Sequence, residues 1–215
     1  MNNLPNQFFY SKKEDRLNVL SHGFGFVLSI IGLVFLINKG LQNFNLTYFI
    51  SLLIYGLSLS TMYIASTLYH NSKTANSRYN LRMFDMISIY ILIAGSYTPF
   101  TLILLKDNQG WLLFIIIWLL AFFGIAWKVF TVGKYNLVTT SLYIFMGGLW
   151  LFFYESFVNQ IPSDALWWIT AGCLTYLAGV IFYLLDNKLK YNHFIWHLFV
   201  LAASGCHYIS IYFYI

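Results

Sequence analysis

Seven long apolar stretches, separated by short polar connections, constrain this chain more than any other feature of its sequence. Each stretch is roughly 18 to 24 residues long, the length that a helix needs to cross the hydrocarbon core of a bilayer. Backbone groups in lipid must find hydrogen-bond partners within their own segment, so we expect each stretch to be an α-helix. The stretches cover approximately residues 17–37, 46–69, 83–105, 111–130, 137–154, 165–185 and 194–215.

The composition excludes a soluble globular protein. Of the 215 residues, 60% are hydrophobic and only 9% are charged, whereas about a quarter of the residues in a soluble domain are charged. We therefore predict an all-α integral membrane protein. It comprises a short amino-terminal segment, residues 1–16, and a single seven-helix transmembrane domain, residues 17–215. The fifth stretch is the shortest, and it contains Gly147 and Gly148.

The distribution of lysine and arginine predicts the orientation in the membrane. If the amino terminus is cytoplasmic, only Lys39 and Lys106 of the 12 basic residues lie on the outer side. Cytoplasmic loops carry such an excess of basic residues, so we expect the amino terminus inside and the carboxyl terminus outside. The net charge of +5 then reflects basic loops that face an anionic leaflet, and no nucleic-acid partner is expected.

Polar residues at the inner ends of three stretches are predicted to form one shared site. Ser66 and His70 end the second stretch, Asp85 opens the third, and His193 and His197 open the seventh. The last two are four residues apart and therefore lie on one face of a helix. Ionisable groups at membrane depth are costly and usually face partners inside the bundle, so their common depth indicates a site.

A zinc-dependent hydrolysis would use this set of residues. The imidazoles of His70, His193 and His197 leave zinc an open fourth position for water, and zinc can lower the pKa of that water to about 7. Asp85 could orient or deprotonate the water, or accept a hydrogen bond from an imidazole. Ser66 could donate to a carbonyl oxygen that becomes negative during attack. This set of residues is suited to hydrolysing an amide or ester bond in a lipid.

Each of these residues also has a purely structural interpretation. The histidines could be ordinary polar residues at a membrane interface. Asp85 could be a carboxylate stabilised by the dipole of its own helix. The hydroxyl of Ser66 could bond back to the carbonyl of Met62, as most transmembrane serines do.

Two further histidines are kept outside the ligand set: His22 is a zinc neighbour or a helix-packing residue, of which packing is favoured, and His207 is a packing or hydrogen-bonding residue. His22 lies beside a stripe of small residues, which lets another helix approach closely. His207 lies ten residues beyond His197, which is about 15 Å further along a helix and too far to join the site. The small residues beside His22 are Gly23, Gly25, Ser29 and Gly32.

The chain resembles the bacterial hemolysin III proteins, which belong to the progestin and adipoQ receptor family, within a superfamily that includes alkaline ceramidases. The resemblance extends over essentially the whole chain, and its motifs fall in the expected helices and order. The motifs are D-R-L-N-V-L-S-H (Asp15 to His22), S-T-L-Y-H (Ser66 to His70), L-R-M-F-D (Leu81 to Asp85), A-G-S-Y-T-P-F (Ala94 to Phe100) and H-F-I-W-H (His193 to His197).

The resemblance implies a multi-pass protein of the bacterial plasma membrane with a zinc ion near the cytoplasmic face. It places the zinc ligands on His70, His193 and His197, with Asp85 holding the zinc-bound water and Ser66 beside it. Asp15 stands where the family usually has glutamate, and Ser21 where it often has threonine; both changes keep the functional group. Receptor members carry a long cytoplasmic amino-terminal extension that this sequence lacks, which argues against hormone binding.

Three functional hypotheses follow from the sequence. The first is a zinc-dependent hydrolase that cleaves a membrane lipid. The second is a non-enzymatic regulator that senses a lipid ligand and uses zinc as a structural staple. The third, a directly cytolytic factor, is the weakest, because a seven-helix apolar chain has no polar stripe to line a pore. The sequence assigns neither a particular lipid nor an oligomeric state.

Overall fold

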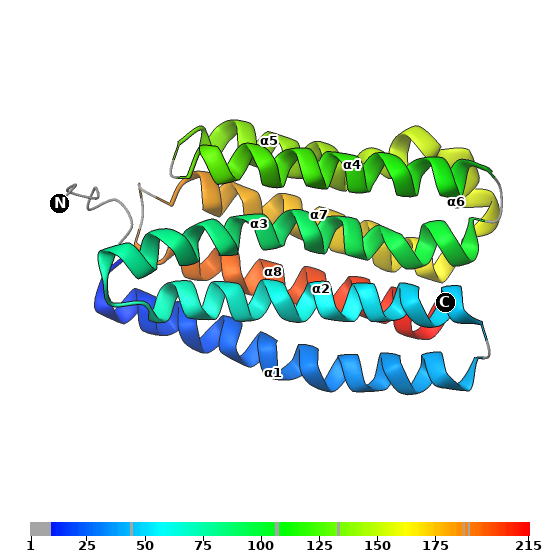
Figure 1. The fold of residues 1–215 in the computed structure, drawn as a ribbon, viewed down its shortest axis with the longest axis horizontal. Coiled ribbons are helices and arrows are strands. Elements are labelled where there is room, and N and C mark those ends of the chain that lie inside the picture. Colours follow the sequence, from blue (N-terminus) through cyan, green and yellow to red (C-terminus); the bar gives the residue numbers. More distant parts are fainter. Residues whose placement is uncertain (1–9, 44, 106–107, 133, 187, 189) are drawn as a thin grey trace.

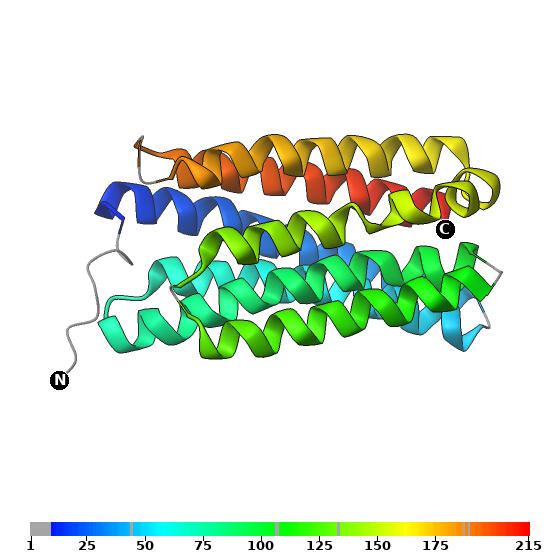
Figure 2. The same ribbon diagram turned by 90° about the horizontal axis from the view of Figure 1, so that it is seen from above.

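The chain folds as one bundle of long helices that lie side by side (Figures 1 and 2). The computed structural model describes residues 10–215 except 44, 106–107, 133, 187 and 189. Within this part, 7 helical spans are long and apolar enough to cross a membrane. The predicted all-α, seven-helix membrane fold is therefore confirmed.

Five of the spans are single helices and two are composite. The third span joins a helix to a π-helical turn, and the fifth joins two helices through a 3-10 turn. The elements are α1 (Lys12–Gln42), α2 (Leu46–Asn71), α3 (Ala75–Pro99), η2 (Phe100–Leu104), α4 (Asn108–Phe130), α5 (Asn136–Gly147), η3 (Leu149–Phe153), α6 (Tyr154–Gln160), α7 (Ser163–Leu184) and α8 (Asn192–Tyr214).

The helices form a closed ring. Along the chain, α1 packs on α2, α2 on α3 and α3 on α4, while α8 packs on both α7 and α1. The contact between α5 and α7, which closes the ring, is among the slightest. Figure 1 places the beginnings of α1, α3, α5 and α8 at one end of the bundle. We call this the inner end, because the basic residues predict that it is cytoplasmic.

Two helices begin well before the apolar stretches that predicted them. The first begins at Lys12, where the Ser11 hydroxyl caps it by accepting from the backbone N–H of Glu14 at 3.2 Å. The third begins at Ala75, within residues that the sequence assigned to a polar loop. Hydropathy marks only the part of a helix that matches the bilayer, whereas capping residues determine where the helix itself begins.

The fifth span is interrupted at Gly147 and Gly148, the pair that made this stretch the least regular in sequence. The hydroxyl of Tyr97 on α3 donates to the carbonyls of Met146, at 2.9 Å, and Gly147, at 3.0 Å. It also accepts from the backbone N–H of Trp150 at 3.2 Å. A buried tyrosine thus satisfies backbone groups that the break releases, which is what makes an interrupted helix tolerable in a membrane.

Small residues bring α1 close to its neighbours, as their spacing predicts. Gly25 and Gly32 lie on the buried face of α1. The hydroxyl of Tyr208 on α8 donates to the carbonyl of Gly32 at 2.9 Å. A Cβ added at Gly32 would lie 2.7 Å from the Tyr208 ring, so a larger residue would separate the two helices.

Candidate metal centre and adjoining cavity

Three buried histidines meet at the inner end of the bundle. His70 comes from the last turn of α2, and His193 and His197 come from successive turns at the start of α8. Their ring centroids are 4.7 to 5.0 Å apart. One potential ligand atom from each lies within 4.8 Å of the others, so the group could hold a metal ion. Packing of α8 against the α1–α2 pair brings these distant parts of the sequence together.

The start of α8 is held in place by its own cap region. Tyr191 adopts the left-handed conformation, with φ 65°, and turns the chain into the helix. The side-chain amide of Asn192 donates to the carbonyl of Leu185, just after α7, at 2.9 Å. This bond ties the first turn of α8 to the end of α7, so the position of His193 depends on both helices.

The Nδ1 atom of His197 faces the hydroxyl of Ser21, whose proton is donated to a backbone carbonyl. Ser21 donates to the carbonyl of Asn18 at 3.0 Å, and its oxygen lies 3.2 Å from Nδ1 of His197. The serine oxygen must therefore accept from Nδ1–H, which leaves the lone pair of the ring on Nε2. This is the tautomer that ligates a metal through Nε2.

The same tautomer is favoured at His70. Its Nδ1 lies 3.1 Å from Oδ1 of Asp15, an acceptor, and 3.3 Å from the side-chain amide of Asn18. The Asp15 carboxylate is in turn fixed by the buried guanidinium of Arg78, which donates to Oδ1 at 2.7 Å. A carboxylate that accepts from a ligand histidine orients the ring and increases its basicity toward a metal.

At His193 the acceptors come from outside the membrane spans. Nδ1 lies 3.0 Å from the hydroxyl of Tyr10 and 3.3 Å from Oδ2 of Asp186. The hydroxyl of Tyr10 donates a hydrogen bond to Oδ2 of Asp186 at 2.6 Å. Burial and the charge of nearby acidic groups raise the pKa of Tyr10, so it stays protonated. Burial favours the neutral form of Asp186, but the hydrogen bonds from His193 and Tyr10 outweigh it and lower its pKa.

The remaining nitrogens fit a metal ion. Nε2 of His70 and Nε2 of His193 are buried and have no hydrogen-bond partner among the described residues. An unsatisfied buried nitrogen costs on the order of 1–3 kcal/mol, and a bound cation would remove that cost. Three neutral imidazoles held by second partners on Nδ1 match the ligand set of a zinc site with an open position.

Asp85 and Ser66 lie close to the histidines. The hydroxyl of Ser66 lies beside the Asp85 carboxylate. Both residues line a cavity whose wall also includes His193 and His197. Ser66 precedes His70 by one helical turn, so α2 supplies both, while Asp85 comes from the neighbouring α3.

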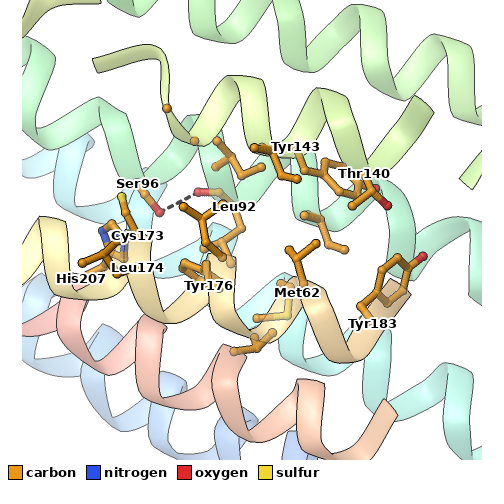
Figure 3. Close-up of a pocket in the computed structure, with 18 of the residues that line it drawn as sticks. Met62, Leu92, Ser96, Thr140, Tyr143, Cys173, Leu174, Tyr176, Tyr183 and His207 are labelled. Atoms are coloured by element: carbon orange, nitrogen blue, oxygen red, sulfur yellow. Dashed lines mark hydrogen bonds between the residues drawn. The ribbon is translucent and has the colours of Figure 1, made fainter. Parts of the chain in front are cut away.

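The cavity has a volume of about 550 Å³ and runs along the bundle from the histidines. Its lining is mostly apolar. Figure 3 shows Tyr183 and Thr140 at one end and His207 and Cys173 toward the other. His207 thus lies far from the metal-binding group, as its spacing predicts, although it faces the same cavity.

The cavity reaches the lipid-facing surface between the fifth and sixth spans. Ile144 and Leu151 line it from one side of this seam, and Leu174 and Leu177 from the other. All four are also exposed on the outside of the bundle, by 40 to 61%. An apolar molecule could therefore enter from the bilayer without crossing the aqueous phase.

Sequence reasoning missed Tyr10 and Asp186, and it counted Arg78 only among the basic residues that predict the orientation. Tyr10 lies in a segment assigned only to a polar amino terminus, and Asp186 in a connection noted only for its turn-forming residues. The signal that could have found Asp186 is a carboxylate placed between the sixth stretch and His193. Tyr10 carries no comparable signal, because its role depends on contacts with residues far away in the sequence.

Comparison with known proteins places this arrangement in one family. Residues 10–208 match the family model described as "Haemolysin-III related". The chain is 36% identical over 203 residues to "Hemolysin-3" of Bacillus cereus, covering 94% of this chain and 92% of that protein. It is 35% identical over 205 residues to "Hemolysin-3 homolog" of Bacillus subtilis (strain 168), covering 95% and 96%.

The likeness extends to a mammalian protein. The chain is 32% identical over 171 residues to "Monocyte to macrophage differentiation factor" of Homo sapiens, which covers 75% of this chain and 69% of that protein. The seven apolar helices and the bacterial relatives identify a multi-pass bacterial membrane protein. With nearly its whole length matched and its sequence motifs in the expected helices, the chain belongs to the haemolysin-III family.

Proposed function

We propose that this protein is a zinc-dependent hydrolase that cleaves an amide or ester bond in a membrane lipid. One observation carries the proposal: a buried group of three histidines shares a mostly apolar cavity with Asp85 and Ser66, and this cavity opens toward the bilayer. A bound zinc ion with three imidazole ligands keeps a position for water and activates it for attack. The chain's own residues would provide the rest of the chemistry.

Asp85 is the residue that we assign to proton transfer. Its carboxylate faces the cavity beside His193 and His197, where the attacking water and the scissile bond would meet. A carboxylate at this point can accept a proton from water and return it to the leaving amine or alcohol. Such general acid–base work contributes typically about 10²–10⁴-fold to the rate.

Ser66 is assigned to positioning Asp85. In this role the hydroxyl donates its single proton to the neighbouring carboxylate, so the same proton does not serve a developing oxyanion. By holding one carboxylate oxygen, Ser66 leaves the other to face the cavity. This assignment differs from the oxyanion role that its position one turn before His70 first indicated.

The cavity would hold the acyl chain of the substrate. A volume of about 550 Å³ lies within the range of small-molecule sites. The seam between α5 and α7 offers a path from the bilayer, because residues on both of its sides are exposed to lipid and also line the cavity. An amphiphile entering there would place its chain along the wall and its polar linkage toward the histidines.

The regulatory alternative, with zinc as a staple, is less well supported. A structural zinc is normally held by four protein ligands, and the described residues bring three histidines together. His22 lies close, but its ring stacks face to face on His197 instead of converging with the three. A direct lytic role gains no support from a cavity with an apolar wall, since a pore needs a polar lumen.

The proposal can be tested with purified protein in liposomes that contain synthetic lipid amides and esters. We expect zinc-replete protein to release free fatty acid, detected by mass spectrometry, and a chelator to abolish the release. Asp85→Asn should keep its zinc and lose about 100-fold or more of the activity, whereas Asp164→Asn, at an exposed position on α7, should not. Failure of the zinc-replete protein to cleave either class would refute the hydrolase; equal turnover in Asp85→Asn would refute the role of Asp85.

A further inference from the structure

Two residues that are 176 positions apart in the sequence, Tyr10 and Asp186, close over His193 at the inner end. Tyr10 immediately precedes the cap of α1, and Asp186 follows the end of α7. They are joined by the hydrogen bond of 2.6 Å from the Tyr10 hydroxyl to Oδ2 of Asp186. Neither belongs to a membrane span, yet both are within hydrogen-bonding distance of Nδ1 of His193.

The direction of these hydrogen bonds determines which ring nitrogen of His193 carries the proton. The tyrosine has one proton, and it goes to Asp186, so the tyrosine oxygen can only accept from the imidazole. The carboxylate is also an acceptor. Nδ1 of His193 must therefore carry the proton, and Nε2 presents its lone pair toward His70 and His197. Loss of either acceptor weakens the preference for this tautomer and frees the ring to turn.

Tyr10 also packs on the site. Its ring centroid lies 4.7 Å from that of His193 and 5.5 Å from that of His70. It thus touches histidines from α8 and α2 at once, and the short segment before α1 is held down by the same residues that would bind a metal. A change in the position of either imidazole changes the contacts of Tyr10.

We propose that Tyr10 and Asp186 are positioning residues that couple metal binding to the docking of Tyr10 and Ser11, the described residues before α1, at the inner end. The inference rests on the zinc site of the proposed function. Because coupling between two equilibria is reciprocal, the docked tyrosine raises the affinity of the histidines for zinc, and bound zinc holds the tyrosine in place. The occupancy of a buried site is thereby reported to the aqueous face.

The first half of the coupling is measured as zinc affinity. Competition with a fluorescent chelator would be carried out on detergent-purified full-length protein. Replacement of an outer partner of a metal ligand typically weakens metal binding about 10- to 100-fold; we expect Asp186→Asn in this range and Tyr10→Phe a several-fold loss. Asp186→Glu, which keeps the acceptor, should recover part of the affinity, as a purely structural defect would not.

Matched controls are available at the same end of the molecule and elsewhere on the surface. Tyr135→Phe changes an exposed tyrosine at the inner end, between α4 and α5, and Asp164→Asn an exposed aspartate on α7. Both should bind zinc as the unmodified protein does. Thermal melting of each metal-free variant ensures that a loss of affinity is not a loss of folding.

The second half is measured as protection of the amino-terminal segment. Lys12 and Lys13 are exposed and follow Tyr10 closely, so trypsin cleavage after them reports how often this segment opens. Zinc should slow this cleavage several-fold in the unmodified protein. The protection should be lost in Tyr10→Phe and Asp186→Asn at zinc concentrations that saturate each variant.

The outcomes separate this inference from the proposed function. If the unmodified protein binds zinc and both variants bind it equally well, the coupling is refuted and the hydrolase stands. The coupling would also be refuted if zinc did not change the rate of trypsin cleavage after Lys12 and Lys13 in the unmodified protein. If the unmodified protein binds no zinc, the proposed function itself fails, and the coupling fails with it.

Discussion

The imidazole of His22 stacks on that of His197, with ring centroids 3.6 Å apart and planes inclined by 16°. The other side of His22 meets Tyr63 of α2 edge to face, at 5.2 Å. His22 therefore fills the space between a candidate metal ligand and the neighbouring helix. The packing role that the sequence favoured is consistent with this position. The ring on which His22 packs, however, is that of His197, a candidate metal ligand.

Replacing His22 separates packing from chemistry. His22→Phe keeps a flat ring against His197, so we expect zinc to be retained and stability to change by less than about 1.5 kcal/mol. His22→Ala leaves a void beside a ligand and should cost roughly 2 kcal/mol. Thermal unfolding in detergent and chelator competition measure both effects. A folded His22→Phe variant without zinc would mean that a nitrogen of His22 is needed.

Metal analysis of the purified protein tests the three histidines directly. We expect about one zinc ion per chain in the unmodified protein and its loss from His70→Ala, His193→Ala and His197→Ala. His207→Ala serves as the control, because His207 lies in the same cavity but away from the group. Mass spectrometry of chelator-free preparations gives the result. Unchanged zinc in all three variants would place the metal elsewhere.

Arg78 is expected to contribute to both stability and zinc affinity. It is buried, and it fixes the Asp15 carboxylate that faces His70. Removal of one partner of a buried ion pair costs about 3–5 kcal/mol, toward the lower end here because Asp15 is partly exposed. Arg78→Met should therefore unfold at a lower denaturant concentration and bind zinc more weakly, while Arg16→Met, at an exposed position, should do neither. Equal unfolding midpoints would contradict this role.

Filling the cavity should block lipid uptake without disturbing the metal. Leu92 points into the cavity from α3 (Figure 3), and Leu92→Trp adds a large ring there. We expect binding of a fluorescent fatty acid to weaken about tenfold or more, equivalent to about 1.4 kcal/mol, with zinc content unchanged. Leu112→Trp, on the lipid-facing surface of α4, is the matched control. Equal binding of the fatty acid by both variants would show that its acyl chain binds outside this cavity.

The fold class was predictable because each span is a local property. The free energy of moving an apolar side chain into lipid depends on that side chain, and a run of about 20 of them is sufficient to predict a membrane helix. The pairing of His193 and His197 was equally local, since residues four apart share a helix face. The orientation from the basic residues and the assignment of zinc remain predictions.

Helix ends and the shape of the fifth span were less accessible to prediction. The polar residues from Ala75 onward are helical because Thr74 caps them. A search for apolar stretches does not detect them. The interruption at Gly147 persists because Tyr97, from another helix, bonds to the released backbone groups. Both features depend on individual hydrogen bonds, which hydropathy does not register.

The sequence by itself thus determined seven helices, their order, and a pair of histidines on one face of the last helix. The common depth of the polar residues also predicted that His70 joins them, and the structure brings the three together. Only the tertiary structure decided that His22 stacks against His197 and that Tyr10 and Asp186 close over His193. The physical reason is range. Helix formation and transfer into lipid are governed by residues adjacent in the chain. The contact between Tyr10 and Asp186, which are 176 residues apart in the sequence, exists only once the packed helices have brought them together.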